Sequence, residues 1–221
     1  MNIPPELTPP IVQLAAGGLF LAALVHAAVR APWDLLRANR LQHIFGASIP
    51  LLLPFWSMRA GVHPGLDIHL LGAMALVLVF GPRLALVALT GVILALTAVG
   101  GYGWANLGVN GLVGAAIPVL VAARIQRLVW TWLPRHLFVY LFGNAFFGAM
   151  LTAAAAVCAT ALLLWSAGNY SLSFLAGEYL ILLPLIMFME GFVTGLILTM
   201  LVVYRPDWVR SMNDRVYLDY R

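Results

Sequence analysis

The sequence contains no lysine, a single cysteine and few charged residues of any kind. Charged side chains make up 9% of its 221 residues, whereas a soluble domain has roughly 25%. Hydrophobic residues make up 63%, and the mean hydropathy is +0.97. These values predict an integral membrane protein. With only Cys158 present, an internal disulfide, a cysteine-based zinc site and an iron–sulfur cluster are excluded.

Motifs of the common membrane and soluble enzymes are also missing. The sequence has no glycine-rich phosphate loop, no G-x-S-x-G, no H-E-x-x-H and no paired carboxylates within an apolar run. We therefore do not expect an enzyme. The net charge of +4 comes from arginines scattered between apolar runs, so we expect no nucleic-acid partner. The N-terminal stretch MNIPPELTPP lacks the charged region and cleavage site of a signal peptide, so the first helix is expected to be retained.

The apolar runs predict an all-α, polytopic membrane helix bundle with about seven transmembrane helices. One membrane domain, 1–221, is expected, with an extracytoplasmic segment 1–10, a bundle 11–204 and a cytoplasmic tail 205–221. The predicted spans are Ile11–Val29, Leu41–Met58, Leu66–Phe80, Leu84–Gly100, Ala105–Ala123, Leu137–Trp165 and Tyr179–Tyr204. The third is too short to cross a core of ~30 Å. It spans only if it packs inside the bundle or starts from a re-entrant loop.

The arginines predict which way the bundle faces. If the N-terminus lies outside, eleven of the twelve arginines fall on the inner side and only Arg59 falls outside. Cytoplasmic loops of membrane proteins carry an excess of positive charge. The sequence therefore predicts a multi-pass protein of the cell (inner) membrane, with its N-terminus outside and its C-terminus inside.

Glu190 is the one carboxyl group expected deep in the membrane. It lies twelve residues after Glu178, roughly 18 Å along a helix. Burying an ionisable group there is costly, so such a residue is a functional candidate. Glu190 either belongs to an ion pathway or ties helices together through hydrogen bonds, and the sequence leaves both open.

A second group, His63, Asp67 and His69, lies just before the third predicted span. Imidazole is the commonest metal ligand in proteins and suits nickel, cobalt, copper and zinc. The two histidines are six residues apart and would not share a helix face. Two hypotheses follow, a partial metal site or a histidine that caps a loop through backbone hydrogen bonds.

Asn106 and Asn110 are four residues apart, so a helix would place them on one face near its outer end. They are predicted to hydrogen-bond either a ligand or a strand of the chain packed into the bundle. Interhelical bonding is the alternative.

Three stretches together resemble a known family. They are HLLGAMALVLVFGPRLALVALTGVILAL, GGYGWANLGVNGLVGAAIPVLVAARIQRLV and MEGFVTGLI. Their order and spacing resemble the CbiM/NikM family, the substrate-binding membrane components of cobalt and nickel energy-coupling factor (ECF) transporters. The resemblance covers 61–127 well and the last span moderately.

The resemblance implies a metal site built partly from the N-terminus of the chain. In that family, the amine of residue 1, the backbone nitrogen and histidine side chain of residue 2, and a later histidine bind Ni²⁺ or Co²⁺ in a square plane. Met1 and His69 match this pattern, and Asn110 would help to hold the N-terminal strand. Residue 2, however, is Asn2. Either His63 replaces the missing ligand, or the metal differs, with Cu²⁺ also suited to such a plane, or this chain does not bind metal in this way.

The resemblance also implies a function. The chain would be the substrate-capture component of an ECF-type transition-metal importer, with the cation as substrate and no tightly bound cofactor. Its partners would be the lipid bilayer, a transmembrane coupling protein and ABC ATPases. The departure at Asn2 motivates the alternative, a non-transporting scaffold or assembly protein of the same fold with a degenerate metal site.

Overall fold

The structure is a computed structural model that describes residues 2–38, 41–61 and 63–212. Within these ranges it is helical, apart from loops and one isolated β-bridge between Ala60 and Ile68. The all-α fold class is therefore confirmed. The α-helices are α1 (Pro10–Arg30), α2 (Trp33–Ala38), α3 (Gln42–Ser57), α4 (Ala73–Phe80), α5 (Pro82–Ala98), α6 (Leu107–Gly111), α7 (Ile117–Trp132), α8 (Leu137–Val139), α9 (Ala149–Ser166), α10 (Leu172–Glu178) and α11 (Leu183–Tyr204).

Several of these helices join without a break. A short turn η2 (Trp104–Asn106) leads into α6, which continues through a π-helical segment η3 (Leu112–Ala116) into α7. Likewise, α8 continues through the π-helical η4 (Tyr140–Gly148) into α9, and α10 through η5 (Leu180–Leu182) into α11. These three composite helices and α1 are the four described helices long and apolar enough to cross a membrane. The chain is thus a multi-pass membrane protein, and the count of seven spans and their orientation remain predictions.

Two of the expected boundaries differ from the structure. The run Leu66–Phe80 is helical only from Ala73 onward, because residues 66–72 form an extended segment that leads into the bundle. The loop expected before Tyr179 is partly helical, since Ser171 caps α10 by accepting a hydrogen bond from the Phe174 amide at 3.2 Å. A serine at this position satisfies an amide that the helix start leaves free.

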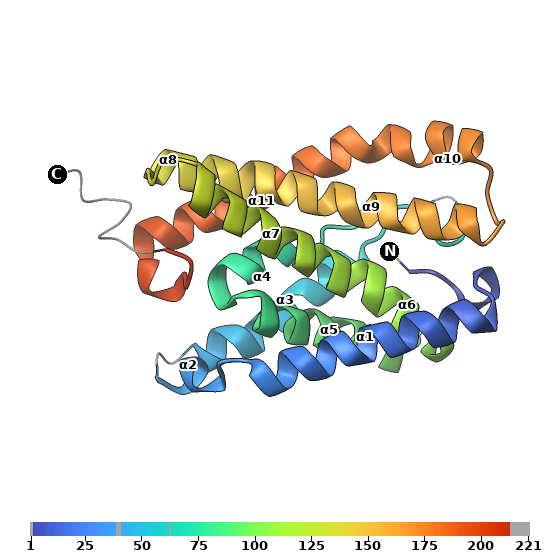
Figure 1. Ribbon diagram of the computed structural model, residues 1–221, viewed down its shortest axis with the longest axis horizontal. Coiled ribbons are helices and arrows are strands. Elements are labelled where there is room, and N and C mark those ends of the chain that lie inside the picture. Colours follow the sequence, from blue (N-terminus) through green and yellow to red (C-terminus); the bar gives the residue numbers. More distant parts are fainter. Residues whose placement is uncertain (1, 39–40, 62, 213–221) are drawn as a thin grey trace.

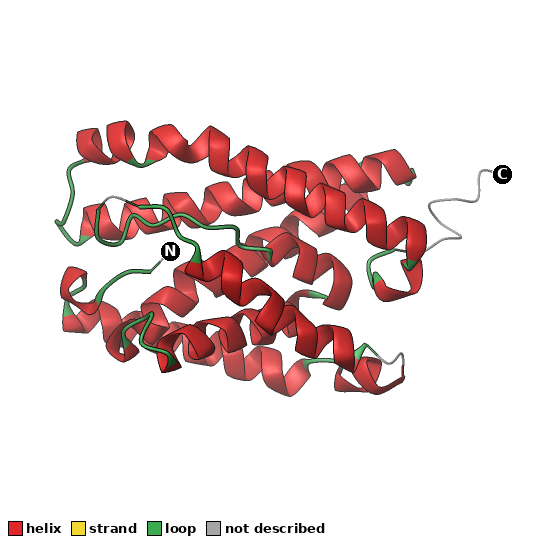
Figure 2. Ribbon diagram, turned by 180° about the vertical axis from the view of Figure 1, so that it is seen from behind, coloured by secondary structure: helices red, strands yellow, loops and turns green. Residues whose placement is uncertain are grey.

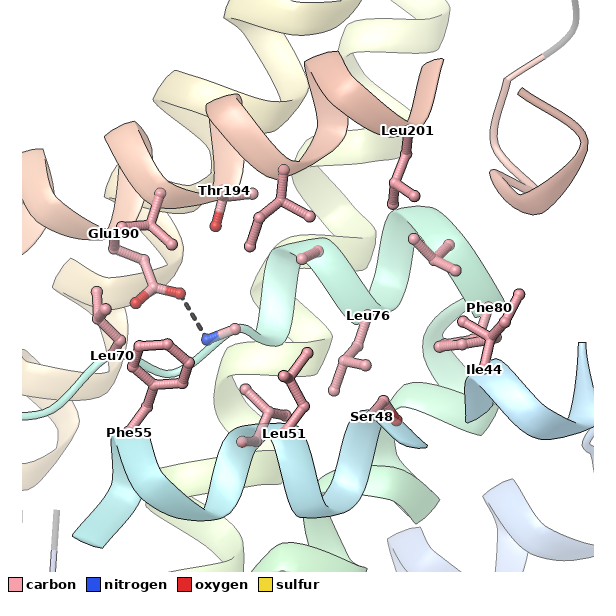
Figure 3. Close-up of a pocket in the computed structure, with 16 residues that line it drawn as sticks. Ile44, Ser48, Leu51, Phe55, Leu70, Leu76, Phe80, Glu190, Thr194 and Leu201 are labelled. Carbon is pink, nitrogen blue, oxygen red and sulfur yellow. Dashed lines mark hydrogen bonds between the residues drawn. The ribbon is translucent and has the colours of Figure 1, made fainter. Parts of the chain in front are cut away.

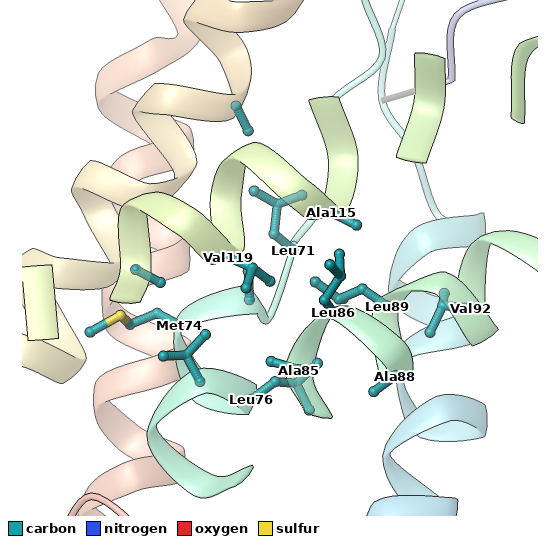
Figure 4. Close-up of a cluster of buried hydrophobic side chains, with 14 of the residues drawn as sticks. Leu71, Met74, Leu76, Ala85, Leu86, Ala88, Leu89, Val92, Ala115 and Val119 are labelled. Carbon is teal, nitrogen blue, oxygen red and sulfur yellow. The ribbon is translucent and has the colours of Figure 1, made fainter. Parts of the chain in front are cut away.

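The short helix α4 lies at the centre of the molecule. It packs against α5 and α7, and α11 passes over it (Figure 1). Seven of its eight residues are buried, all except Ala75. Figure 4 shows its Met74 and Leu76 among leucines, valines and alanines of α5 and of the α6–α7 helix. At 1.5 Å per residue, α4 covers only ~12 Å, which is too short to cross a membrane core of ~30 Å.

Candidate metal-binding site

The N-terminal segment enters the bundle as an extended stretch, residues 2–4, which we call the N-terminal strand; a 3-10 turn, η1 (Pro5–Leu7), follows it. The strand is held in place by α6 and the turn before it. Ile3 is fully buried, and its amide donates a hydrogen bond to Oδ1 of Asn110 at 2.8 Å. Nδ2 of Asn106 donates to the carbonyls of Ile3 and Pro4 at 2.9 and 3.0 Å. Both asparagines are buried, at 0% and 1% exposure. Their predicted role in holding a strand of the chain agrees with these contacts.

Three further polar residues fasten the same segment. Thr8 donates to Oδ1 of Asn106 at 2.8 Å. Nδ2 of Asn169, in the loop before α10, donates to the carbonyl of Leu7 at 2.6 Å. Nε2 of Gln13, in α1, donates to the carbonyls of Pro5 and Thr8 at 3.0 and 2.9 Å. None of these three contacts was predicted from the sequence, although Gln13 stands out as a lone amide within an apolar run.

Glycines in the LGVNG motif let α6 approach α1 closely. A Cβ on Gly108 would overlap the backbone of Gly17, and one on Gly111 would lie 2.5 Å from the ring of Phe20. The motif therefore has two structural roles within one short helix. Its glycines fix α1 against α6, and its asparagine holds the strand that precedes α1.

His69 lies in the extended segment before α4 and is 7% exposed. Its Nδ1 is 3.1 Å from the carbonyl oxygen of Leu70. A carbonyl only accepts, so Nδ1 carries the hydrogen and Nε2 of the neutral ring keeps a lone pair. Among the described residues, this buried Nε2 has no hydrogen-bond partner. Metal-binding histidines commonly donate their other ring N–H to a backbone carbonyl in this way.

Trp56 orients the His69 ring. The two rings lie 4.4 Å apart between centroids, and the indole N–H of Trp56 donates to the carbonyl of Leu71 at 3.3 Å. On its other side the indole reaches Gly114, one turn beyond Asn110, at 3.6 Å from the position of a Cβ there. A single buried tryptophan thus links the histidine to the helix that holds the N-terminal strand.

Asn2 is the first described residue of the N-terminal strand. Its Nδ2 donates to the carbonyl of Gly101 at 3.1 Å, which leaves Oδ1 buried and without a hydrogen-bond partner among the described residues. Tyr102, which follows Gly101, lies beneath the guanidinium of Arg59. Arg59 precedes the hairpin closed by the bridge between Ala60 and Ile68, and this hairpin leads to His69. Both views of the fold show the N-terminal strand ending near this hairpin (Figures 1 and 2). Met1, the other residue expected at this site, lies outside the described residues.

His63 and Asp67 make other contacts. The His63 ring packs edge-to-face against Phe174 of α10, with 4.9 Å between centroids. Asp67 forms an ion pair with Arg59, at 3.5 Å between Oδ2 and NH1. Across the part of the chain that the structure describes, three His, Cys, Asp or Glu side chains do not converge to hold a metal. His63 is thus engaged by an aromatic contact, and its ligand role stays a prediction.

Glu190 is 1% exposed and faces the start of α4. Its two carboxyl oxygens accept hydrogen bonds from the amides of Leu71 and Gly72, each at 2.7 Å. The first amides of a helix have no partner within the helix, and at this depth water is not available to them. These bonds favour the helix-tying role for Glu190. They also fix the backbone two residues after His69.

A cavity of about 150 Å³ lies beside Glu190, between α3 and α11 and above α4. Figure 3 shows Ser48, Leu51 and Phe55 of α3 facing Glu190 and Thr194 of α11 across it. Its lining is almost wholly apolar. Glu190 lines this cavity, and its carboxyl oxygens accept hydrogen bonds from the backbone amides of Leu71 and Gly72.

A family model described as "Cobalt uptake substrate-specific transmembrane region", CbiM, matches residues 2–208. The chain belongs to the CbiM family. Membership makes it a transport protein, a component of a metal-uptake system, and not an enzyme. It also accounts for the resemblance seen in the sequence.

Two solved structures resemble the fold of this CbiM-family chain. One, described as a truncated transition metal transporter, shares 21% identity with a TM-score of 0.78 and covers 92% of this chain and 99% of its own. The other, described as a transition metal transporter, shares 22% identity with a TM-score of 0.76 and covers 91% and 92%. No curated protein sequence matches the chain.

Proposed function

We propose that the chain is the substrate-capture component of an ECF-type importer for a transition-metal cation. This proposal rests on the presence, in one bundle, of a buried N-terminal strand and a histidine with a ring nitrogen that is free to bind a metal. The strand is held by Asn106 and Asn110, while Nε2 of His69 is buried and unpaired among the described residues. A transporter needs such a ligand lone pair, and an inert membrane protein does not.

The cation would be bound by the amine of Met1, the backbone nitrogen of Asn2 and Nε2 of His69. Since Nδ2 of Asn2 is engaged by Gly101, its Oδ1 is the side-chain atom left for the remaining position. An amide oxygen is a harder donor than imidazole, so affinity for Ni²⁺ and Cu²⁺ would be lower than in a site with histidine at residue 2. Ni²⁺ and Co²⁺ are the proposed substrates, with Cu²⁺ as the competitor to test.

The arginine distribution supports a placement of this site on the outer side of the cell membrane. The chain has no nucleotide-binding loop, so uptake would need a transmembrane coupling protein and ABC ATPases. Membership of a cobalt-uptake family supports the proposal that such partners are needed.

The test is a metal titration of purified protein with a free Met1, using Ni²⁺, Co²⁺, Cu²⁺ and Zn²⁺. One cation should bind at a ratio of one to one, and His69→Ala should weaken it by at least about 100-fold. His26→Ala, near the end of α1, is the matched control and should change nothing. His63→Ala should also leave affinity unchanged. Equal affinity of His69→Ala and the parent would refute the proposal.

The engagement of the Asn2 side chain by Gly101 favours one other candidate, a non-transporting scaffold of the same fold. That protein would bind none of the four cations stoichiometrically and would not copurify with an ATPase-bearing complex. Failure of both experiments would establish it in place of the importer.

A further inference from the structure

Two adjoining cavities of about 350 and 330 Å³ lie at the arginine-rich end of the bundle, far from His69 along α4. They share Pro82, Gln126 and Ser211 as lining residues. The start of α5, the last turns of α7, the π-helical η4 and the segment after η6 (Pro206–Trp208) enclose them. In Figure 1, this end carries α8 and the loop that follows α11. Together they form one polar recess, which we call the arginine recess.

Among the described residues, three cations line the arginine recess and no carboxyl group does. Arg83 and Arg210 border one cavity and Arg127 the other. Arg210 donates to the carbonyl of Phe80 at 3.2 Å, and Arg83 to the carbonyl of Arg30 at 3.0 Å. Each contact uses one of five guanidinium N–H groups. The described part of the chain gives none of the three an ion pair, so their charges remain available to an anion.

The floor of the recess contains a polar group that lacks a partner. Asn144, in η4, lines the recess at 2% exposure, and its Oδ1 makes no hydrogen bond within the described structure. Leaving a buried amide oxygen unpaired is costly. Beside it, the hydroxyls of Tyr140 and Ser211 are 2.6 Å apart. π-Helical segments such as η4 often occur at functional sites.

We propose that the arginine recess binds the glycerophosphate headgroup of an anionic phospholipid. The phosphate oxygens accept hydrogen bonds from Arg83, Arg127 and Arg210, and a glycerol hydroxyl donates to Oδ1 of Asn144. Guanidinium groups bind phosphate through parallel charge-assisted hydrogen bonds. An anion alone would leave the amide oxygen unpaired, so a headgroup that carries both phosphate and hydroxyls fits the two halves of the recess.

The surroundings identify the source as a lipid. Trp130 lines the recess and is 41% exposed. Leu133, just after α7, and Phe142, in η4, are 45% and 47% exposed. Tryptophan is enriched at the depth of lipid headgroups, and the exposed apolar side chains offer a surface for acyl chains. Basic pockets between transmembrane helices are known to hold anionic headgroups.

The test measures lipid binding by the whole purified chain in neutral detergent. Short-chain phosphatidylglycerol is titrated and followed by tryptophan fluorescence, with phosphatidylcholine, glycerol 1-phosphate and oligoglutamate as comparison ligands. We expect saturable binding of phosphatidylglycerol alone. The Arg83→Gln/Arg127→Gln double variant should weaken it by about tenfold or more, which corresponds to the loss of charge-assisted bonds. Arg124→Gln, one turn earlier on α7 and outside the recess, is the matched control and should stay within about twofold.

Asn144→Ala separates a ligand-binding role from a structural one. If Oδ1 serves the ligand, this variant loses phosphatidylglycerol affinity without losing thermal stability, because the bond is absent in the free protein. A fall in stability with unchanged affinity would overturn the proposal. So would equal binding of glycerol 1-phosphate, which would identify a soluble ligand, or binding only of an acidic peptide such as oligoglutamate, which would identify a protein partner. Equal losses of affinity in Arg124→Gln and the double variant would show that binding depends only on overall positive charge, which would also overturn the proposal. None of these outcomes depends on metal binding at His69.

Discussion

The two ends of α4 are held in different ways. At its start, the amides of Leu71 and Gly72 both donate to the one carboxyl group of Glu190. At its end, the segment after α11 supplies several donors. Ser211 Oγ donates to the carbonyl of Leu78 at 2.8 Å. In the same segment, the Arg210 amide donates to the carbonyl of Val79 at 3.1 Å and the Arg210 guanidinium to that of Phe80 at 3.2 Å.

This difference shows how a short, buried helix keeps the backbone groups at its two ends paired. A backbone group buried at either end must find a partner, because an unpaired buried N–H or C=O costs free energy. A carboxyl group at the start and a cation at the end also suit the helix dipole. The start depends on one side chain, and the end shares the task among several groups. Loss of a single group should therefore affect the two ends unequally.

The largest effect is expected at the start. Glu190→Ala leaves two buried amides unpaired, so the free energy of unfolding should fall by about 3 kcal/mol. Equilibrium unfolding in mixed detergent micelles, followed by tryptophan fluorescence, measures it. Glu190→Gln keeps one acceptor and should lose less. A Glu190→Ala protein as stable as its parent would show that the start of α4 does not depend on this one side chain.

A glycine lies at each end of α4, and the two differ in backbone conformation. Gly81, at the end, has φ +85° and ψ 163°, whereas Gly72, at the start, has φ +68° and ψ 7°. The first conformation is essentially restricted to glycine, and the second is only disfavoured for other residues. Gly81→Ala should cost about 2 kcal/mol and Gly72→Ala about 1 kcal/mol in the same unfolding assay. The reverse order would contradict this assignment of strain.

A smaller effect is expected for the side chain at the end of α4. Arg210→Ala removes one hydrogen bond to the carbonyl of Phe80 and leaves the bonds from Ser211 and the backbone amide of residue 210. Its cost should be about 1 kcal/mol. A loss as large as that of Glu190→Ala would show that the end also depends on a single group.

The smallest effect is expected for Arg59, whose ion pair with Asp67 lies near the surface. Arg59→Gln should change stability by roughly 0.5 kcal/mol or less, because exposed pairs are weak. Metal affinity should stay the same, since Asp67 is not among the proposed ligands. A large loss of metal affinity would show that this hairpin, and not only Glu190, positions His69.

The helical bundle and part of its site could be predicted from the sequence. Long apolar runs identify helices because their period and length are local properties. Asn106 and Asn110 stand out because two amides four residues apart in such a run share a face. His69 stands out as an imidazole at the start of a short run.

Other features depend on contacts between distant parts of the chain. That Glu190 caps α4 follows from the meeting of residues more than a hundred positions apart. The contact of His63 with Phe174 likewise required α10, which replaced an expected loop. The LGVNG motif is visible in the sequence, but it does not show that Gly108 packs against the backbone of Gly17. Sequence patterns identified polar groups at depth, and only the fold showed which of them are already paired.

The central claim is that the N-terminal strand and His69 form one capture site. The most direct test compares metal affinity in two forms of the protein, one with a free Met1 and one with a single glycine added before it. The added residue moves the amine by about 3.5 Å, while Ile3 stays bonded to Asn110. We predict that the extended form loses affinity by at least about 100-fold, as His69→Ala does. Equal affinity in the two forms would contradict the claim and place the cation away from the N-terminus.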